Sequence, residues 1–252
     1  MELLSALEVI RALTKRSAVV RSRDFAAHGI GRHYLRAAEQ HGLIVRNGRG
    51  LYSACNFDTT EFHSFAEVAK RVPRGVICLL SALRFHEVTN QNPFEVWIAI
   101  GEKDRSPRQN GAAVRVSRFS RPSLAFGQTT HVVEGVPLLV FSVAKTVADC
   151  FKYRNKIGLE VALEALRDSL SQGKATTSEI REAAQVCRVA NIMRPYLEAV
   201  SLGPAITRNP PGNLAAVRKG PNRQGGPSTL AAAVPEKNRP AKHSIKDTGL
   251  LP

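Results

Sequence analysis

The 252-residue sequence has little cysteine, little aromatic character and no long apolar run. Its four cysteines, Cys55, Cys78, Cys150 and Cys187, are scattered without a C-x-x-C pair, which predicts reduced thiols and excludes a disulfide framework. The longest apolar run, residues 76–83, is interrupted by a serine and is too short to cross a bilayer. Early charged residues also argue against a signal peptide. We therefore expect a cytoplasmic protein with no membrane partner.

Acidic residues are scarce relative to basic ones. The chain has 36 Lys and Arg against 21 Asp and Glu, a net charge of +15. Such an excess predicts a polyanionic partner, with nucleic acid first and an acidic membrane surface second. With 43% hydrophobic residues, the chain is long enough for one large folded domain or two small ones.

The composition changes near residue 202. Residues 203–252 contain eight Pro, six Gly, eight Lys or Arg, two Asp or Glu and none of Phe, Trp and Tyr. This composition predicts a disordered basic tail. The part before it divides near residues 57–60, which predicts a first domain over 1–57 and a second over 60–202.

The first domain has the pattern of three helices followed by a hairpin. Apolar residues recur at helical spacing over residues 2–13, Ser22 is placed to cap a short helix over 22–27, and a third helix is expected over 31–41. Asn47-Gly48 between apolar stretches predicts the hairpin turn. This order is the plan of a winged helix-turn-helix.

The charges of this domain fit DNA binding. The third helix would enter the major groove and carries Arg32, His33 and Arg36 near its start. The tip of the wing carries Arg46, Asn47 and Arg49, placed to reach phosphates or the minor groove. The alternative is a small basic domain that binds protein.

The second domain is predicted to be α+β, because its strands come as a block and most helices follow. The expected elements are helices over 62–71 and 76–86, strands over 95–100 and 113–119, a hairpin around Glu134-Gly135, and helices over 143–153, 159–171, 177–187 and 192–200, with Ser142 as an N-cap.

Catalytic and metal-binding patterns are weak in this sequence. Histidines and cysteines do not cluster at ligand spacings, and the S-x-x-K run at 142–145 lacks its S-D-N and K-T-G companions. Glu160, Glu164 and Asp168 read as a solvated helix face. We therefore expect no enzyme activity, cofactor or metal.

A second basic group follows later in the chain. It consists of Lys145, Lys152, Arg154 and Lys156. One interpretation is a basic surface that binds nucleic acid or an acidic protein. The other is that these cations stabilise the C-terminus of a helix by interacting with its dipole.

Several stretches of the chain resemble the AbiEi-type antitoxins of type IV toxin–antitoxin systems. In the first domain these are residues 23–32 (RDFAAHGIGR) and 48–52 (GRGLY). In the second they are 75–89 (GVICLLSALRFHEVT), 93–100 (PFEVWIAI), and 142–158 (SVAKTVADCFKYRNKIG) continuing through 161–166. The resemblance covers about residues 3–200 and not the tail. Val143 stands where the family pattern has a proline.

The resemblance implies a transcriptional repressor that binds inverted repeats in double-stranded DNA at its own promoter through the winged helix. It also implies that the second domain counteracts a cognate nucleotidyltransferase-like toxin, without a requirement for a tight complex. Two other hypotheses stay open from the residues alone. One is a winged helix fused to a nuclease-like domain, although no strand-borne D…(D/E)-x-K is found, and the other is a protein-interaction module.

Deleting residues 203–252 tests how the charge is divided. Because the tail contributes eight basic against two acidic residues, its loss is expected to weaken non-specific DNA binding and to flatten the salt dependence of the binding constant. Titration of an unrelated duplex over a salt series measures this. An unchanged slope would show that the tail does not contact phosphates.

Overall fold

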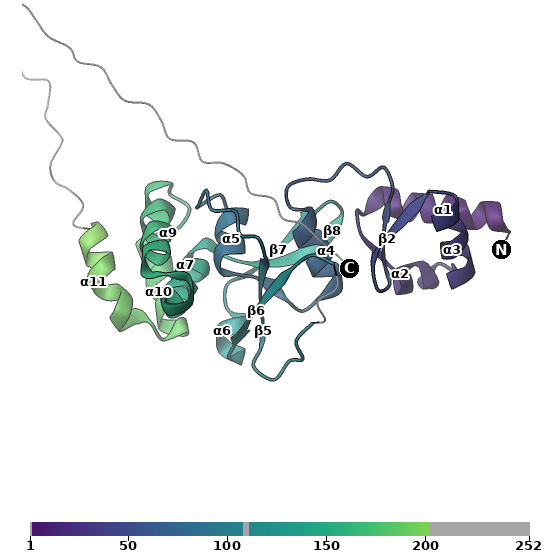
Figure 1. Cartoon of the computed structure of the whole chain (residues 1–252). Helices are drawn as coiled ribbons and strands as arrows, with labels where there is room; N and C mark the ends of the chain where they lie inside the picture. Colours follow the sequence, from purple (N-terminus) through teal and green to yellow (C-terminus); the bar gives the residue numbers. More distant parts are fainter. Residues whose placement is uncertain (1, 108–110, 202–252) are drawn as a thin grey trace, which may run out of the picture. The chain divides into compact units, whose positions relative to one another are not determined.

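The computed structural model describes residues 2–107 and 111–201, so the predicted tail lies outside the described residues. Helices and two separate sheets make up this part, which confirms the mixed α+β class (Figure 1). The described residues all belong to one compact unit, and the division near residues 57–60 stays a prediction. Over the described ranges, no helix has both the length and the apolar character needed to cross a membrane.

The N-terminal elements surround a small core of their own. They are α1 (Leu3–Arg16), β1 (Val20–Arg21), α2 (Ser22–Ala27), α3 (Arg32–Gln40), β2 (Ile44–Gly48) and β3 (Leu51–Ala54). The strands form an antiparallel sheet in the order β1-β3-β2. The core between helices and sheet consists of Ala6, Ile10, Val20, Phe25, Ile30, Leu35, Ala38 and Ile44.

The hairpin of this sheet differs from the prediction in its turn. Asn47-Gly48 was the predicted turn, but both residues belong to β2, and Gly48 pairs with Leu51. The register shifts between Arg46 and Gly48, where β2 carries one extra residue. The turn lies at Arg49-Gly50, two positions further along the chain than predicted. Gly50, at φ +71°, takes the left-handed conformation that the turn needs.

Two smaller differences concern the start of α2. Ser22 is the first residue of the helix, while Arg21 stands at the N-cap position. The Asp24 carboxylate accepts the backbone N–H of Arg21 over 3.2 Å and so caps the N-terminus of α2. Strand β1 was not predicted, because two residues carry no readable periodicity.

The second sheet has five strands in the order β6-β5-β4-β8-β7. Its strands are β4 (Val76–Ile77), β5 (Val96–Gly101), β6 (Val114–Phe119), β7 (Gln128–Val133) and β8 (Val136–Phe141). β4 runs parallel to β8 and β5 parallel to β6, while β4–β5 and β7–β8 are antiparallel. The short α6 (Arg121–Ala125) connects β6 to β7.

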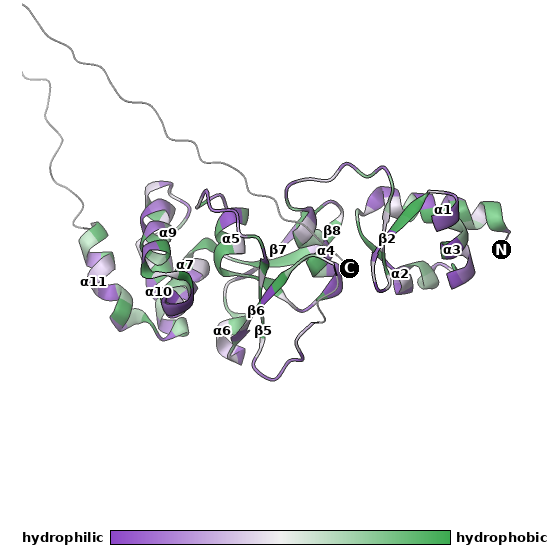
Figure 2. Ribbon diagram, viewed as in Figure 1, coloured by the Kyte–Doolittle hydropathy of each residue, from purple (hydrophilic) through white to green (hydrophobic). Residues whose placement is uncertain are grey.

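Both faces of this sheet are covered, so its inner strands are hydrophobic almost throughout (Figure 2). Alternate residues of β5 point to opposite sides. Ile98 and Ile100 pack with Phe65 of α4 (His63–Arg71). Trp97 and Ala99 belong to a larger core shared with the later helices.

The stretch 76–86 was predicted to be one helix, and this is wrong at its start. Val76 and Ile77 form β4, paired on both sides, and α5 spans only Leu79–Phe85. Between them, the N–H of Cys78 donates to the Trp97 carbonyl, and Leu79 adopts φ +49°. A short apolar run fits a buried strand as well as a helix, which explains the error.

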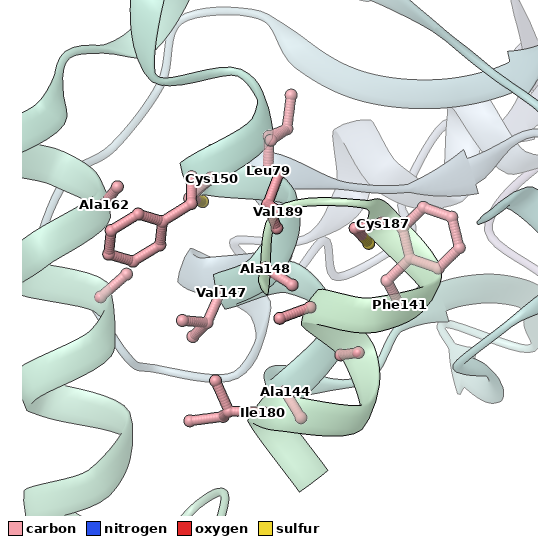
Figure 3. Packing of buried hydrophobic residues seen from close by; sticks show 14 of the residues in the cluster. Leu79, Phe141, Ala144, Val147, Ala148, Cys150, Ala162, Ile180, Cys187 and Val189 are labelled. Carbon is pink, nitrogen blue, oxygen red and sulfur yellow. The ribbon is translucent and has the colours of Figure 1, made fainter. Parts of the chain in front are cut away.

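Helices α7 (Val143–Lys152), α8 (Arg154–Ile157), α9 (Leu159–Ser171), α10 (Thr177–Cys187) and α11 (Ala190–Ser201) follow the sheet. The predicted N-cap is confirmed, since the Ser142 hydroxyl accepts the Lys145 N–H. Every residue of α7 from Ala144 to Phe151 is buried. Figure 3 shows Ala144, Val147 and Ala148 among side chains that include Ile180 and Cys187 of α10.

A charged pair lies in this core and corrects one prediction. Lys145, predicted to belong to a basic surface, is 0% exposed. Its ammonium pairs with the equally buried Asp149 and lies 4.2 Å from the centroid of the Phe141 ring. The Cys187 thiol donates to the other Asp149 oxygen over 3.2 Å. Burial raises the pKa of Asp149, against the opposing effect of Lys145.

The turn between β7 and β8 holds the N-terminal elements. Glu134 and Gly135 form the predicted hairpin turn, at φ +51° and +73°. The Glu134 carboxylate accepts the N–H and hydroxyl of Thr60 and lies 2.7 Å from Nδ1 of His63, and its carbonyl accepts the Ala18 N–H. A Cβ on Gly135 would lie 1.9 Å from the Arg16 carbonyl oxygen, so only glycine fits this contact.

Replacing Asp149 by Ala tests the buried pair. The substitution leaves the Lys145 ammonium in the core without its anion, so we expect the free energy of unfolding to fall by about 3–5 kcal/mol. Urea unfolding of the full chain measures this.

The control is the double variant Lys145→Met with Asp149→Leu, which removes both charges and keeps apolar volume. We expect it to recover most of the stability lost in the single variant. Equal stability of Asp149→Ala and the unsubstituted chain would show that the pair is not desolvated.

Candidate nucleic-acid interface

Helix α3 presents a basic face because its apolar residues turn inward. Leu35 and Ala38 are buried in the N-terminal core, three residues apart on one side of the helix. Arg32 and Arg36 are exposed and four residues apart, so they share one solvent-facing side of the helix. Gly31 occupies the N-cap position in extended backbone. The packing of this helix therefore determines which cations face solvent.

The β2–β3 hairpin places two more arginines near that helix. Arg46 is exposed on β2, directly across from Tyr52 of β3, and its Nε donates to the Gly48 carbonyl over 3.2 Å. Arg49 is exposed in the turn next to Gly50. The Ser22 N–H donates to the Gly50 carbonyl over 2.9 Å, which ties the turn to α2.

These four arginines line one concave surface, named here the wing pocket. Its volume is about 620 Å³, and its lining is Ser22, Arg32, Arg36, Glu39, Arg46, Arg49, Gly50 and Tyr52. Among the residues that the structure describes, none of the four guanidiniums forms an ion pair with a carboxylate. The pocket therefore combines strong positive charge with donors available to a ligand.

Four residues of the wing pocket were not predicted from the sequence, namely Ser22, Glu39, Gly50 and Tyr52. Glu39 lies three residues after Arg36, on the same side of α3, and Tyr52 is the cross-strand partner of Arg46. Glu39 could have been found from its helical spacing to Arg36, and Tyr52 from the register of the hairpin. Ser22 lines the wing pocket because its N–H binds the Gly50 carbonyl of the turn, a contact that the sequence does not reveal.

His33 and Asn47, the other two predicted contacts, do not line the wing pocket. His33 is exposed, and its ring lies 3.9 Å from that of Tyr34 between centroids. The Asn47 amide donates to the Ser53 hydroxyl over 2.7 Å, across the hairpin. The structure thus brings together the arginines of the predicted set and places His33 and Asn47 elsewhere.

The second predicted basic group is divided by the structure. Lys145 is in the core, as described above. Lys156 is exposed, and its ammonium lies 5.5 Å from the Tyr153 ring centroid. Lys152 and Arg154 are half-buried, and Arg154 donates to the Phe151 carbonyl over 3.0 Å. At most three residues of this group therefore form a surface.

The S-x-x-K run does not form a nucleophile with its base. Ser142 caps α7, and the ammonium of Lys145 pairs with Asp149 inside the core. Within the described ranges, no three residues of His, Cys, Asp and Glu gather in a way that could hold a metal ion. All four cysteines are free, and Cys55 is exposed.

The chain was compared with known proteins. Among solved structures, the RV2827C protein from Mycobacterium tuberculosis is similar at 15% identity, with a TM-score of 0.39 over 77% of this chain and 81% of that one. A search of curated proteins found no match. Residues 8–54, which carry the whole wing pocket, match the model of the AbiEi_4 family, described as "Transcriptional regulator, AbiEi antitoxin", and this confirms the resemblance for that part of the chain.

Proposed function

We propose that this chain is a DNA-binding transcriptional repressor and antitoxin of a type IV toxin–antitoxin system. The observation that carries the proposal is the wing pocket, where four arginines from α3 and the β2–β3 hairpin meet inside the family-matched segment, none of them in an ion pair with a described carboxylate. A regulator of this kind acts by occupying DNA and needs no catalytic group.

The element order supports a winged helix-turn-helix over residues 3–54. Three helices precede an antiparallel hairpin, and a short strand between the first two helices completes the sheet. In this arrangement α3 is the recognition helix, which the major groove is wide enough to admit. The hairpin is the wing, which reaches the adjacent backbone.

The arginines of the wing pocket suit both kinds of DNA contact. A guanidinium binds O6 and N7 of guanine, or two phosphate oxygens, through paired N–H donors. Arg32 and Arg36 on α3 are assigned to base edges, and Arg46 and Arg49 on the wing are assigned to phosphates. The operator would be an inverted repeat at the chain's own promoter, in keeping with the family resemblance.

The antitoxin role is assigned to the part of the chain after residue 60. The matched family is described as an antitoxin, but its match ends at residue 54. The assignment to the later part therefore rests on the resemblance of residues 75–89, 93–100 and 142–158, and the proposed target is a nucleotidyltransferase-like toxin. Lys152, Arg154 and Lys156 remain candidates for a contact surface in this part, but not Lys145. Repression and toxin neutralisation would then use separate surfaces.

The double variant Arg32→Ala with Arg36→Ala tests the recognition helix. Each good base contact contributes about 1–3 kcal/mol of discrimination, so we expect specific affinity to fall to the level of non-specific binding. Fluorescence anisotropy with the chain's own upstream DNA, against a scrambled duplex of equal length, measures this.

A matched control is Arg167→Ala combined with Arg181→Ala, which removes two exposed arginines from α9 and α10 outside the wing pocket. It should keep the specific affinity. If the α3 double variant also keeps it, α3 is not the recognition helix.

The same α3 double variant separates the two proposed roles. Co-expression with the proposed nucleotidyltransferase-like toxin would measure growth rescue. Because both substitutions lie on α3, we expect the variant to rescue growth as well as the unsubstituted chain while losing promoter repression in a reporter assay. Loss of rescue at equal protein level would show that antitoxicity requires operator binding.

A further inference from the structure

A second basic pocket adjoins the wing pocket and is named here the flank pocket. It has a volume of about 360 Å³ and is lined by Arg21, Ser22, Arg23, Arg49, Gly50, Leu51, Arg71 and Pro107. Ser22, Arg49 and Gly50 belong to both pockets. The two concave surfaces therefore adjoin each other at the turn of the wing.

Two arginines of the flank pocket have clear structural roles. An Nη of Arg21 donates to the carbonyl of Arg71, the last residue of α4, over 3.0 Å. A cation at this position also stabilises the helix dipole. Arg71 donates to the Ala112 carbonyl and lies 4.0 Å from the Glu67 carboxylate. These contacts hold two guanidiniums in place at the wall of the pocket.

Arg23 has no comparable role. Its side chain is 71% exposed, and its Nε lies 3.7 Å from an Asp24 oxygen. Asp24 also accepts the Arg21 N–H and pairs with Lys70 at 3.4 Å. An exposed ion pair of this length contributes little stability. The guanidinium of Arg23 is therefore free to bind an external anion.

The flank pocket is strongly cationic. Its lining holds four arginines and no carboxylate. The pKa of Arg21 is lowered, first by burial and then by the charge of Arg23. These guanidiniums disfavour one another at short range, and a bound anion would relieve this. Such an arrangement favours a ligand with delocalised negative charge, which arginine recognises best as phosphate.

The C-terminal residues of the chain itself are poor candidates for a ligand of the flank pocket. Residues 203–252 carry eight basic and two acidic residues, so their net charge has the same sign as the pocket. Duplex DNA at the wing pocket, in contrast, presents a row of phosphates along each strand. Given the proposed function, a strand leaving the wing pocket meets the flank pocket next.

We infer that the flank pocket binds a backbone phosphate of the DNA duplex beside the operator contacts, with Arg23 and Arg49 as direct ligands and with Arg21 and Arg71 as the fixed positive wall. This inference rests on the proposed function and extends it. Arg71 lies on α4, outside the matched residues 8–54. The DNA footprint therefore includes the part of the chain that follows the wing.

The test uses the full chain and the variant Arg23→Gln, with Arg167→Gln as a control that removes one exposed arginine from α9. The probe is a 30-base-pair duplex of scrambled sequence, because a phosphate contact does not depend on sequence. One lost phosphate contact lowers the slope of log K against log salt by about 0.9, so the ratio of unsubstituted to variant affinity should shrink about threefold between 50 and 200 mM salt. Arg167→Gln should keep the slope of the unsubstituted chain.

Each outcome has a distinct meaning. A reduced slope in Arg23→Gln alone supports the inference. If Arg23→Gln matches the control while Arg32→Ala with Arg36→Ala still loses operator binding, the flank pocket does not contact DNA and the proposed function stands. If the unsubstituted chain binds no duplex, both fail. Saturable binding of inorganic pyrophosphate that Arg23→Gln abolishes, with an unchanged salt slope, would assign the pocket to a small anion and overturn the DNA contact.

Discussion

The structure after residue 60 depends on a helix that is buried on every side. All residues of α7 from Ala144 to Phe151 are removed from solvent, and this stretch includes Lys145 and Asp149. A lone charge at such a depth would be costly, so the two must neutralise each other. Their spacing of four residues places them on one side of the helix. The sheet, α9 and α10 all pack around this neutral unit.

The N-terminal elements follow a different principle, in which charge is kept at the surface. Leu35 and Ala38 pack into the small N-terminal core, so the other sides of α3 face solvent and can carry arginines. The glycine turn of the hairpin then folds Arg49 back toward that helix. Hydrophobic packing thus positions the cations, and their mutual repulsion is tolerated because each remains hydrated until a ligand arrives.

Much of the fold could be predicted because its signals are local. The Glu134-Gly135 turn, the Ser142 cap and the buried face of α3 each depend on residues close in sequence. The errors came from strand pairings that the local pattern does not show. Strand β4 has two residues and exists only through its partners β5 and β8. In the wing, β2 continues through Asn47, whose amide donates to Ser53 across the hairpin, so the turn lies further along the chain than predicted. No local pattern distinguishes these from their alternatives.

The candidate site shows the same division. Arg32 and Arg36 could be placed from helical spacing, and Arg46 and Arg49 from the hairpin. Lys145 was misplaced because its burial depends on elements that the sequence does not position, although its spacing to Asp149 in an otherwise apolar stretch was a visible signal. Arg71 enters the flank pocket only through the fold.

The Glu134 anchor has a consequence for the order of synthesis. Its partners Ala18, Thr60 and His63 precede it by more than 70 residues, so the ribosome delivers all N-terminal elements well before the hairpin that fastens them. Because the contacts of the N-terminal core are local, that core can form first, while closing the long loop to Glu134 comes later. The arginines of the wing pocket therefore emerge on a nascent chain before the remainder of the protein can shield or orient them.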